Sequence, residues 1–124
     1  LVLLMNESWH PAERLDVALK KQNLVPIRDY LDAHYTEKIS LDALAEQFFI
    51  SKFYLTRVFK EQFGVSINTY ILNLRITKAK QLLRFTDQKL ENIGYQCGLG
   101  APHYFSRIFK QVEGITPSEF REKW

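Results

Sequence analysis

The sequence has little of what disulfides, metal centres and enzyme active sites require. A single cysteine, Cys97, excludes a disulfide within the chain and a metal site built from cysteines. The three histidines, His10, His34 and His103, are scattered and lack the spacing of metal ligands. The chain has neither a glycine-rich phosphate loop nor a serine in a nucleophile elbow. We therefore expect no metal, no cofactor and no enzymatic activity.

Long hydrophobic runs are also missing. The opening stretch LVLLM is apolar but ends at Asn6, far short of the ~20 residues that span a bilayer. No small-residue cleavage site follows it. These observations predict a cytoplasmic protein that does not enter a membrane. Because the chain begins at Leu1, inside an apolar run and without Met, we interpret it as a piece of a longer protein.

The composition that remains is that of an ordinary globular domain. The 124 residues suffice for one compact domain or two very small ones, and an aromatic content of 14% argues against disorder. Charge is unevenly distributed: residues 1–50 hold five Lys and Arg against eight Asp and Glu, whereas residues 51–124 hold twelve against six. A basic C-terminal half is a first indication of a polyanionic partner.

One motif occurs twice in this short chain. SKFYLTRVFK at 51–60 and APHYFSRIFK at 101–110 both end in Arg, a β-branched residue, Phe and Lys. The match continues downstream, where Gly64 pairs with Gly114 and Tyr70 with Phe120. Upstream the offset falls from 50 to 49, so the second copy carries one extra residue in its turn. A period of this length indicates one structural unit used twice.

The first copy has the pattern of a short helix, a tight turn and a longer helix. Ser40 and Ser51 are suitable N-caps for the two helices, and Gly64 follows the second as glycine commonly does. Apolar residues recur three and four positions apart, as on one helix face. They are Leu41, Leu44, Ala45 and Phe48, and then Tyr54, Leu55, Val58, Phe59 and Phe63.

The second copy repeats this plan, and two helices joined by a tight turn form a helix-turn-helix unit. A glycine-rich turn spans 98–100, Pro102 stands where a helix start tolerates proline, and Gly114 closes the unit. Cys97 falls on an apolar stripe, so we expect a buried structural cysteine. The two stripes are Leu90, Ile93, Gly94 and Cys97, and Tyr104, Phe105, Ile108, Phe109 and Val112.

Between the two copies, residues 67–85 fit one long helix of about 28 Å, at 1.5 Å per residue. Successive major-groove segments on one side of DNA lie ~34 Å apart. A helix of this length can therefore hold two reading heads about one turn of DNA apart. Its basic residues mostly lie off the apolar stripe; they are Arg75, Lys78, Lys80 and Arg84.

The longer helix of each copy carries similar residues on the face opposite its core. Arginine can donate two hydrogen bonds to guanine, serine, threonine and histidine can reach base edges, and phenylalanine can pack on a thymine methyl. A single face of this kind is as consistent with ordinary solvated surface as with a binding surface, but its repetition favours double-stranded DNA as the partner. The predicted base contacts are Lys52, Phe53, Thr56, Arg57, His103, Ser106 and Arg107, and the predicted phosphate contacts are Ser51, Lys60 and Lys110.

From about Leu24 to Trp124 the sequence resembles the DNA-binding domain of the AraC/XylS family of bacterial transcription regulators. The matching stretches are ISLDALAEQFFISKFYLTRVFKEQFGVSINTYILNLRITKAKQLL and IGYQCGLGAPHYFSRIFKQVEGITPSEFR. The resemblance implies an all-α fold of about seven helices. These are an opening helix near 24–35, helix-turn-helix units near 41–63 and 88–112, a linking helix near 67–85 and a closing helix near 117–123.

The resemblance also implies that both recognition helices enter adjacent major grooves on one side of the DNA. Base-reading positions carried over from the family are Phe53, Thr56, Arg57, His103, Ser106 and Arg107.

Two residues depart from the family pattern, which usually has Ala at the position of Gly94 and an aromatic residue at that of Leu99. Glycine inside a helix costs up to ~1 kcal/mol relative to alanine. The stretch GLGA at 98–101 predicts a looser turn than usual in the second copy. Pro102 lacks a backbone N–H and cannot donate to DNA there.

Residues 1–20 match nothing in this domain, which we place at 21–124. We interpret them as a linker or the tail of a missing regulatory domain; an N-terminal arm docking on the body is the alternative. Besides double-stranded DNA, the candidate partners are RNA polymerase and an effector-sensing domain N-terminal to this segment. Two rival functions stay open: a helical protein-interaction module acting through its basic face, and a helix bundle lying on anionic membrane.

Overall fold

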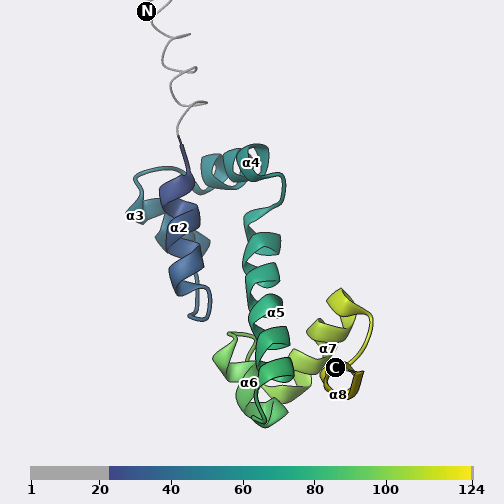
Figure 1. The fold of residues 1–124 in the computed structure, drawn as a ribbon. Helices are drawn as coiled ribbons and strands as arrows, with labels where there is room; N and C mark the ends of the chain where they lie inside the picture. Colours follow the sequence, from purple (N-terminus) through teal and green to yellow (C-terminus); the bar gives the residue numbers. More distant parts are fainter. Residues whose placement is uncertain (1–22, 124) are drawn as a thin grey trace, which may run out of the picture.

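The computed structural model describes residues 23–123, and this part contains seven α-helices and no strand (Figure 1). The helices are α2 (Val25–His34), α3 (Leu41–Gln47), α4 (Lys52–Phe63), α5 (Ile67–Phe85), α6 (Leu90–Gln96), α7 (Pro102–Glu113) and α8 (Pro117–Lys123). The prediction of an all-α fold with two helix-turn-helix units and a long linking helix is confirmed. Residues 1–20, the predicted linker or tail, lie outside the described residues.

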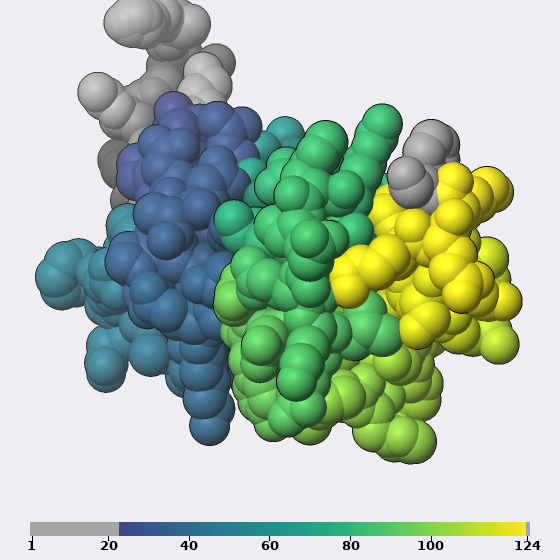
Figure 2. Space-filling model, turned by 60° about the horizontal axis from the view of Figure 1, so that its bottom comes forward, coloured from purple at the N-terminus to yellow at the C-terminus, as the bar shows by residue number. Residues whose placement is uncertain are grey.

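The long helix α5 is the axis of the molecule. In Figure 1, α2, α3 and α4 surround its N-terminal half and α6, α7 and α8 surround its C-terminal half. We call the first group, with that half of α5, the first head, and the second group, with the other half, the second head. Figure 2 shows α2 and α8 on opposite sides of α5. Each head contains one of the two helix-turn-helix units.

Each head has its own hydrophobic core, and α5 contributes to both. The first core includes Ile67 and Ile71 of α5, together with Leu24, Ile27, Leu31, Leu44, Ala45, Leu55, Val58 and Phe59. The second core includes Ile76, Ala79 and Leu83 of α5, together with Ile93, Cys97, Leu99, Phe105 and Phe109.

The predicted caps set the ends of the helices in the first head. The hydroxyl of Ser40 accepts from Ala43 N at 3.2 Å, and that of Ser51 accepts from Tyr54 N at 3.0 Å. Each bond satisfies a backbone donor that the first turn of a helix leaves free. Gly64 and Gly114 follow α4 and α7 with φ of 80° and 86°, the left-handed conformation that ends a helix.

The closing helix α8 begins with a reciprocal capping pair. Thr116 N donates to Glu119 Oε1 at 2.8 Å, and Glu119 N donates to Thr116 Oγ1 at 3.1 Å. The hydrogen bonds from the backbone and side chain of Thr116 hold the pKa of Glu119 below its usual range. This pairing explains the spacing of threonine and glutamate in the TPSEF stretch.

Polar contacts attach α2 and α8 to α5. The hydroxyl of Tyr70 donates to Asp32 Oδ1 at 2.5 Å and so joins α5 to α2. Burial, followed by this hydrogen bond, raises the pKa of Tyr70 to about 12. In the second head, Arg121 of α8 donates to three backbone oxygens at the end of α5 and beyond it, Leu83 O, Thr86 O and Gln88 O, at 2.7–3.2 Å.

The predicted apolar stripe of α7 is partly wrong. Phe105 and Phe109 are fully buried, but Tyr104 is 47% exposed and Val112 is 40% exposed. Phe105 and Phe109 lie one turn apart on α7 and are the two residues of this helix that are fully buried in the second core. Tyr104 and Val112 lie to the sides of these two and remain exposed. The exposed ring of Tyr104 instead lies under the guanidinium of Arg107, 5.5 Å from its centroid.

The expectation of a looser second turn is also wrong. The carbonyl of Gly94 accepts from Leu99 N at 2.9 Å and from Gly100 N at 2.8 Å, and Leu99 is buried. A Cβ at position 94 would lie 2.4 Å from Gly100 O. Glycine at 94 is therefore what allows the turn to close tightly over α6.

The turn of the first helix-turn-helix unit contains a strained residue. Phe49 has a φ of 59°, in the left-handed region, and its side chain is 95% exposed. Phe49 is the second residue after α3, and the second residue after α6 is Gly98, with a φ of 91°. The second copy thus uses glycine at a position where the first uses phenylalanine.

Replacing Phe49 with glycine should therefore stabilise the protein. The left-handed conformation costs a non-glycine residue ~1–2 kcal/mol, and the greater backbone freedom of glycine in the unfolded chain offsets part of the gain. We expect Phe49→Gly to raise the free energy of unfolding by ~0.5–1 kcal/mol, measured by urea denaturation. Phe49→Ala keeps the strained backbone and should leave it nearly unchanged; equal stability of all three proteins would contradict the strain.

Phe59 of α4 and Phe109 of α7 lie on the predicted apolar stripes, and both are fully buried. Phe59→Ala and Phe109→Ala should each cost ~3–5 kcal/mol of stability, because each leaves a large cavity. A domain of this size has ~5–15 kcal/mol in all. Phe85→Ala, at a site 72% exposed, is the matched control. Thermal unfolding in which all three variants melt together would contradict the assignment of the cores.

Candidate nucleic-acid interface

The first candidate face lies along α4 and its N-cap. Ser51, Lys52, Phe53, Arg57 and Lys60 are exposed, as a binding surface requires. From Lys52 to Lys60 the helix rises ~12 Å, about two turns. The structure thus brings these predicted residues together on one stretch of surface.

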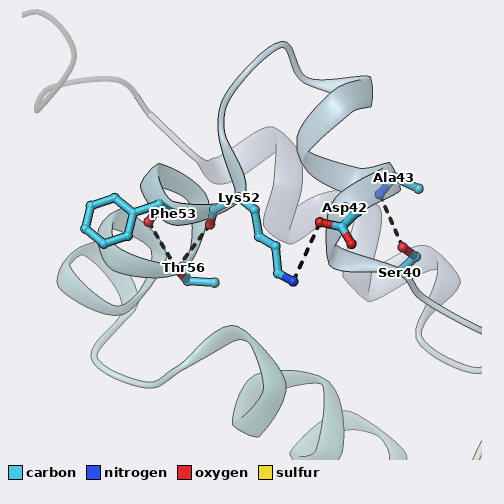
Figure 3. Close-up of polar contacts among 6 residues, drawn as sticks. All are labelled: Ser40, Asp42, Ala43, Lys52, Phe53 and Thr56. Atoms are coloured by element: carbon cyan, nitrogen blue, oxygen red, sulfur yellow. Dashed lines mark hydrogen bonds and ion pairs between the residues drawn. The ribbon is translucent and has the colours of Figure 1, made fainter.

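Thr56 is less exposed than the other predicted contact residues of this face. Thr56 is half-buried, and its hydroxyl donates to Lys52 O at 3.1 Å and Phe53 O at 3.0 Å (Figure 3). Its lone pairs remain as acceptors, and its methyl group can contact a thymine methyl. Ser51 also has a local role, because its oxygen caps α4, but its hydroxyl hydrogen can still donate to a phosphate.

Two ion pairs and one cation–π contact involve Lys52 and Arg57 of this face. Lys52 Nζ lies 3.6 Å from Asp42 Oδ1 and so bridges α4 to α3 (Figure 3). Arg57 Nη1 lies 3.6 Å from Glu61 Oε2, and its guanidinium carbon lies 5.8 Å from the centroid of the Phe53 ring. Exposed ion pairs are worth at most ~1 kcal/mol. A phosphate or guanine can therefore replace these carboxylates at little cost.

The second candidate face lies along α7. His103, Arg107 and Lys110 are exposed and Ser106 is half-buried, the burial pattern of the matching positions on α4. Arg107 stacks on Tyr104, one turn before it, as Arg57 stacks on Phe53. Within residues 23–123, neither Arg107 nor Lys110 forms an ion pair. The face of α7 therefore presents its positive charge without the carboxylate partners found on α4.

Three residues at or near these faces have roles that the sequence did not reveal. Tyr104 was assigned to the core, although an aromatic residue three positions before an exposed arginine is a recognisable stacking signal. Phe49, beside the N-cap of α4, was not singled out. Arg75 was read as one more surface charge of α5, but it donates from Nε to Tyr35 O at 2.6 Å and from Nη2 to Glu37 O at 2.9 Å.

The described residues include one cysteine, no metal-holding cluster and no membrane-spanning helix. Cys97 is buried, as predicted, and burial raises the pKa of its thiol. In residues 23–123 no group of three or more His, Cys, Asp or Glu is placed to hold a metal ion. None of the seven described helices is long and apolar enough to cross a membrane.

Known proteins are similar to this chain in sequence and in fold. A family model described as a helix-turn-helix domain matches residues 44–123. The transcriptional activator RhaS of Escherichia coli is 33% identical over 122 residues, 98% of this chain and 43% of its own length. The chain thus spans less than half the length of this curated relative.

Solved structures give the same result. The C-terminal domain of the two-component response regulator yesN of Fusobacterium nucleatum superposes with a TM-score of 0.73 at 35% identity, covering 77% of this chain and 93% of that one. The DNA-binding domain of AdpA, solved in complex with a target DNA, superposes with a TM-score of 0.75 at 21% identity, covering 81% and 90%. The latter likeness shows the fold alone.

The chain belongs to the helix-turn-helix family of AraC/XylS-type transcription regulators, as its sequence motifs implied. It is a DNA-binding domain of that family, with the two helix-turn-helix units that the fold requires. The relatives reported above are a transcriptional activator, a response regulator and a DNA-binding domain, and none is named as an enzyme.

Proposed function

We propose that the two heads read adjacent major-groove segments on one side of a specific DNA site and so regulate transcription. The observation that supports this proposal is the repetition of one exposed set of residue types on α4 and α7. The 19-residue helix α5 separates these two helices, and its length of ~28 Å is close to one turn of DNA. AdpA, whose DNA-binding domain has this fold, was solved bound to its target.

The roles of the side chains follow from their chemistry. Arg57 and Arg107 donate to guanine, Thr56, Ser106 and His103 reach base edges, and Lys52 joins them at the start of α4. Phe53 packs on a thymine methyl. Phosphates are held by Ser51, Lys60 and Lys110, which lie at the ends of the two helices. In this proposal the domain extends over 21–124 and has no catalytic activity.

The rest of the assembly is inferred from the kind of protein. We infer that residues 1–20 are a linker or the tail of a regulatory domain that senses an effector. RNA polymerase is the natural second partner of a regulator bound beside a promoter, and the cytoplasm, where bacterial DNA lies, is the natural place. The relatives do not favour a protein-interaction module as the primary function. Failure to bind any DNA duplex at low salt would count against DNA as the partner.

The two stacked arginines should act as base readers. Arg57→Ala and Arg107→Ala should each cost ~1–3 kcal/mol of binding free energy and relax base preference at one position of the site. The two affected positions should lie about one helical turn apart. Lys60→Ala is the control, which should weaken all sequences alike and lower the salt slope by about 1. Selection from a random duplex pool measures these preferences, and arginine variants that behave like Lys60→Ala would refute base reading.

The spacing between the two half-sites should be fixed by α5. Five extra base pairs turn the second half-site to the opposite side of the DNA, so one head must release. Loss of one base-reading arginine corresponds to roughly 5- to 150-fold in affinity. We expect the wild type to bind a +5 duplex more weakly than +0, and Arg107→Ala to respond much less. Equal wild-type affinity for +0, +5 and +10 duplexes would show that the heads are not rigidly coupled.

A further inference from the structure

The two heads meet at a second place besides α5 itself. The loop between α2 and α3 belongs to the first head, and the turn between α6 and α7 belongs to the second. Both reach the middle of α5 at Arg75. The side chain of Arg75 donates from Nε to Tyr35 O at 2.6 Å and from Nη2 to Glu37 O at 2.9 Å. These bonds fix the loop of the first head to α5.

The turn of the second head lies directly against this loop. A Cβ placed on Gly98 would lie 2.9 Å from Thr36 Cα, 3.0 Å from Thr36 O and 3.0 Å from Arg75 Nε. No side chain fits there, and the φ of 91° at Gly98 also favours glycine. We call this contact of Arg75, the 35–37 loop segment and Gly98 the clasp.

The clasp is a localised contact beside open space. A cleft of about 250 Å³ adjoins it, and Arg75 is one of the residues that line this cleft. The others are Ile39 before α3, then Asn68, Ile71 and Leu72 of α5, and then Leu99, Tyr104 and Ile108 of the second head. The heads are thus not packed together along their whole facing surfaces. None of the helix pairs in extensive contact joins α2, α3 or α4 to α6, α7 or α8 in the described residues, so the heads are connected mainly through α5.

The chemistry of the clasp requires arginine. A planar guanidinium presents several N–H donors in a fixed fork. It can therefore bond two carbonyls of the 35–37 loop segment while it lies against the backbone of Gly98. An ammonium group on a lysine is a point charge and does not reproduce this geometry. Burial lowers the pKa of Arg75 from its ordinary value, which agrees with a group enclosed by both heads.

We propose that Arg75 is a positioning residue that, together with Gly98, locks the two heads at one relative orientation and thereby sets the half-site spacing that the protein accepts. A single shared helix fixes distance but permits bending and twisting, and a second contact away from its axis removes that freedom. The consequence for spacing rests on the proposed reading of DNA by both heads, whereas the locking itself does not.

Arg121 offers a matched control within the same chain. Like Arg75, it donates to backbone oxygens of a single head, namely Leu83 O, Thr86 O and Gln88 O. It does so from α8, which lies on the opposite side of α5 from α2 (Figure 2) and so away from the contact between the heads. Arg121→Lys should weaken local packing without changing how the heads are oriented. A role of Arg75 in stability alone predicts that Arg75→Lys and Arg121→Lys behave alike.

The locking is tested on the free protein. Spin labels on Lys60→Cys and Lys110→Cys report the distance between α4 and α7. Cys97 is buried, and a Cys97→Ser background keeps the labels at the two chosen positions. Electron–electron resonance should give a narrow distance distribution for the otherwise wild-type protein and for Arg121→Lys. The distribution should broaden for Arg75→Lys and for Gly98→Ala. An unchanged distribution in Arg75→Lys, with its fold intact by circular dichroism, overturns the proposal.

The spacing effect is tested on DNA. One base pair of insertion or deletion turns the half-sites by ~34° relative to each other. The wild type and Arg121→Lys should discriminate strongly between the natural and the altered duplexes. Arg75→Lys should lose roughly threefold or more of this discrimination, while its affinity for a single half-site stays the same. Retained discrimination with a broadened distance distribution would refute the effect on spacing, and failure of the wild type to bind any duplex would refute the proposed function alone.

Discussion

The structure depends on one helix that serves two hydrophobic cores. Ile71 and Ile76 lie five positions apart on α5, but the first is buried in the first head and the second in the second head. Most of the stability of a helix in a protein comes from such packing rather than from its own propensity. Because both halves of α5 are held in this way, the helix acts as a spacer, and the separation of α4 and α7 follows from its length.

Local signals made much of this fold predictable. N-caps such as Ser40 and Ser51 and the glycines that end α4 and α7 act within one helical turn, so the sequence around them contains all the information needed. The apolar periodicity located both cores, including Phe59 and Phe109. The candidate faces followed as the opposite sides of the same helices, and the structure leaves their charged residues exposed.

The features that were not predicted depend on tertiary contacts, on how a turn closes or on an unusual backbone conformation. Arg75 resembles any other basic residue of α5, and its acceptors lie about forty residues away. Gly94 was read as a helix-weakening residue, although the neighbour that requires glycine, Gly100 O, is placed there only by the closed turn. The backbone of Phe49 adopts a conformation that its residue type disfavours. Neither hydrophobic periodicity nor residue propensity predicts these contacts or this backbone conformation.

The two copies of the repeat differ most where they meet. Phe49 and Gly98 both follow a short helix by two residues and both have positive φ, but only the second lies against the other head. A side chain at position 98 would separate the turn from Thr36 and Arg75, whereas the side chain of Phe49 projects into solvent without obstruction. The extra residue of the second turn lengthens the chain between α6 and α7 at this same contact. The proposed locking of the two heads therefore depends on a glycine that the second copy has and the first copy lacks.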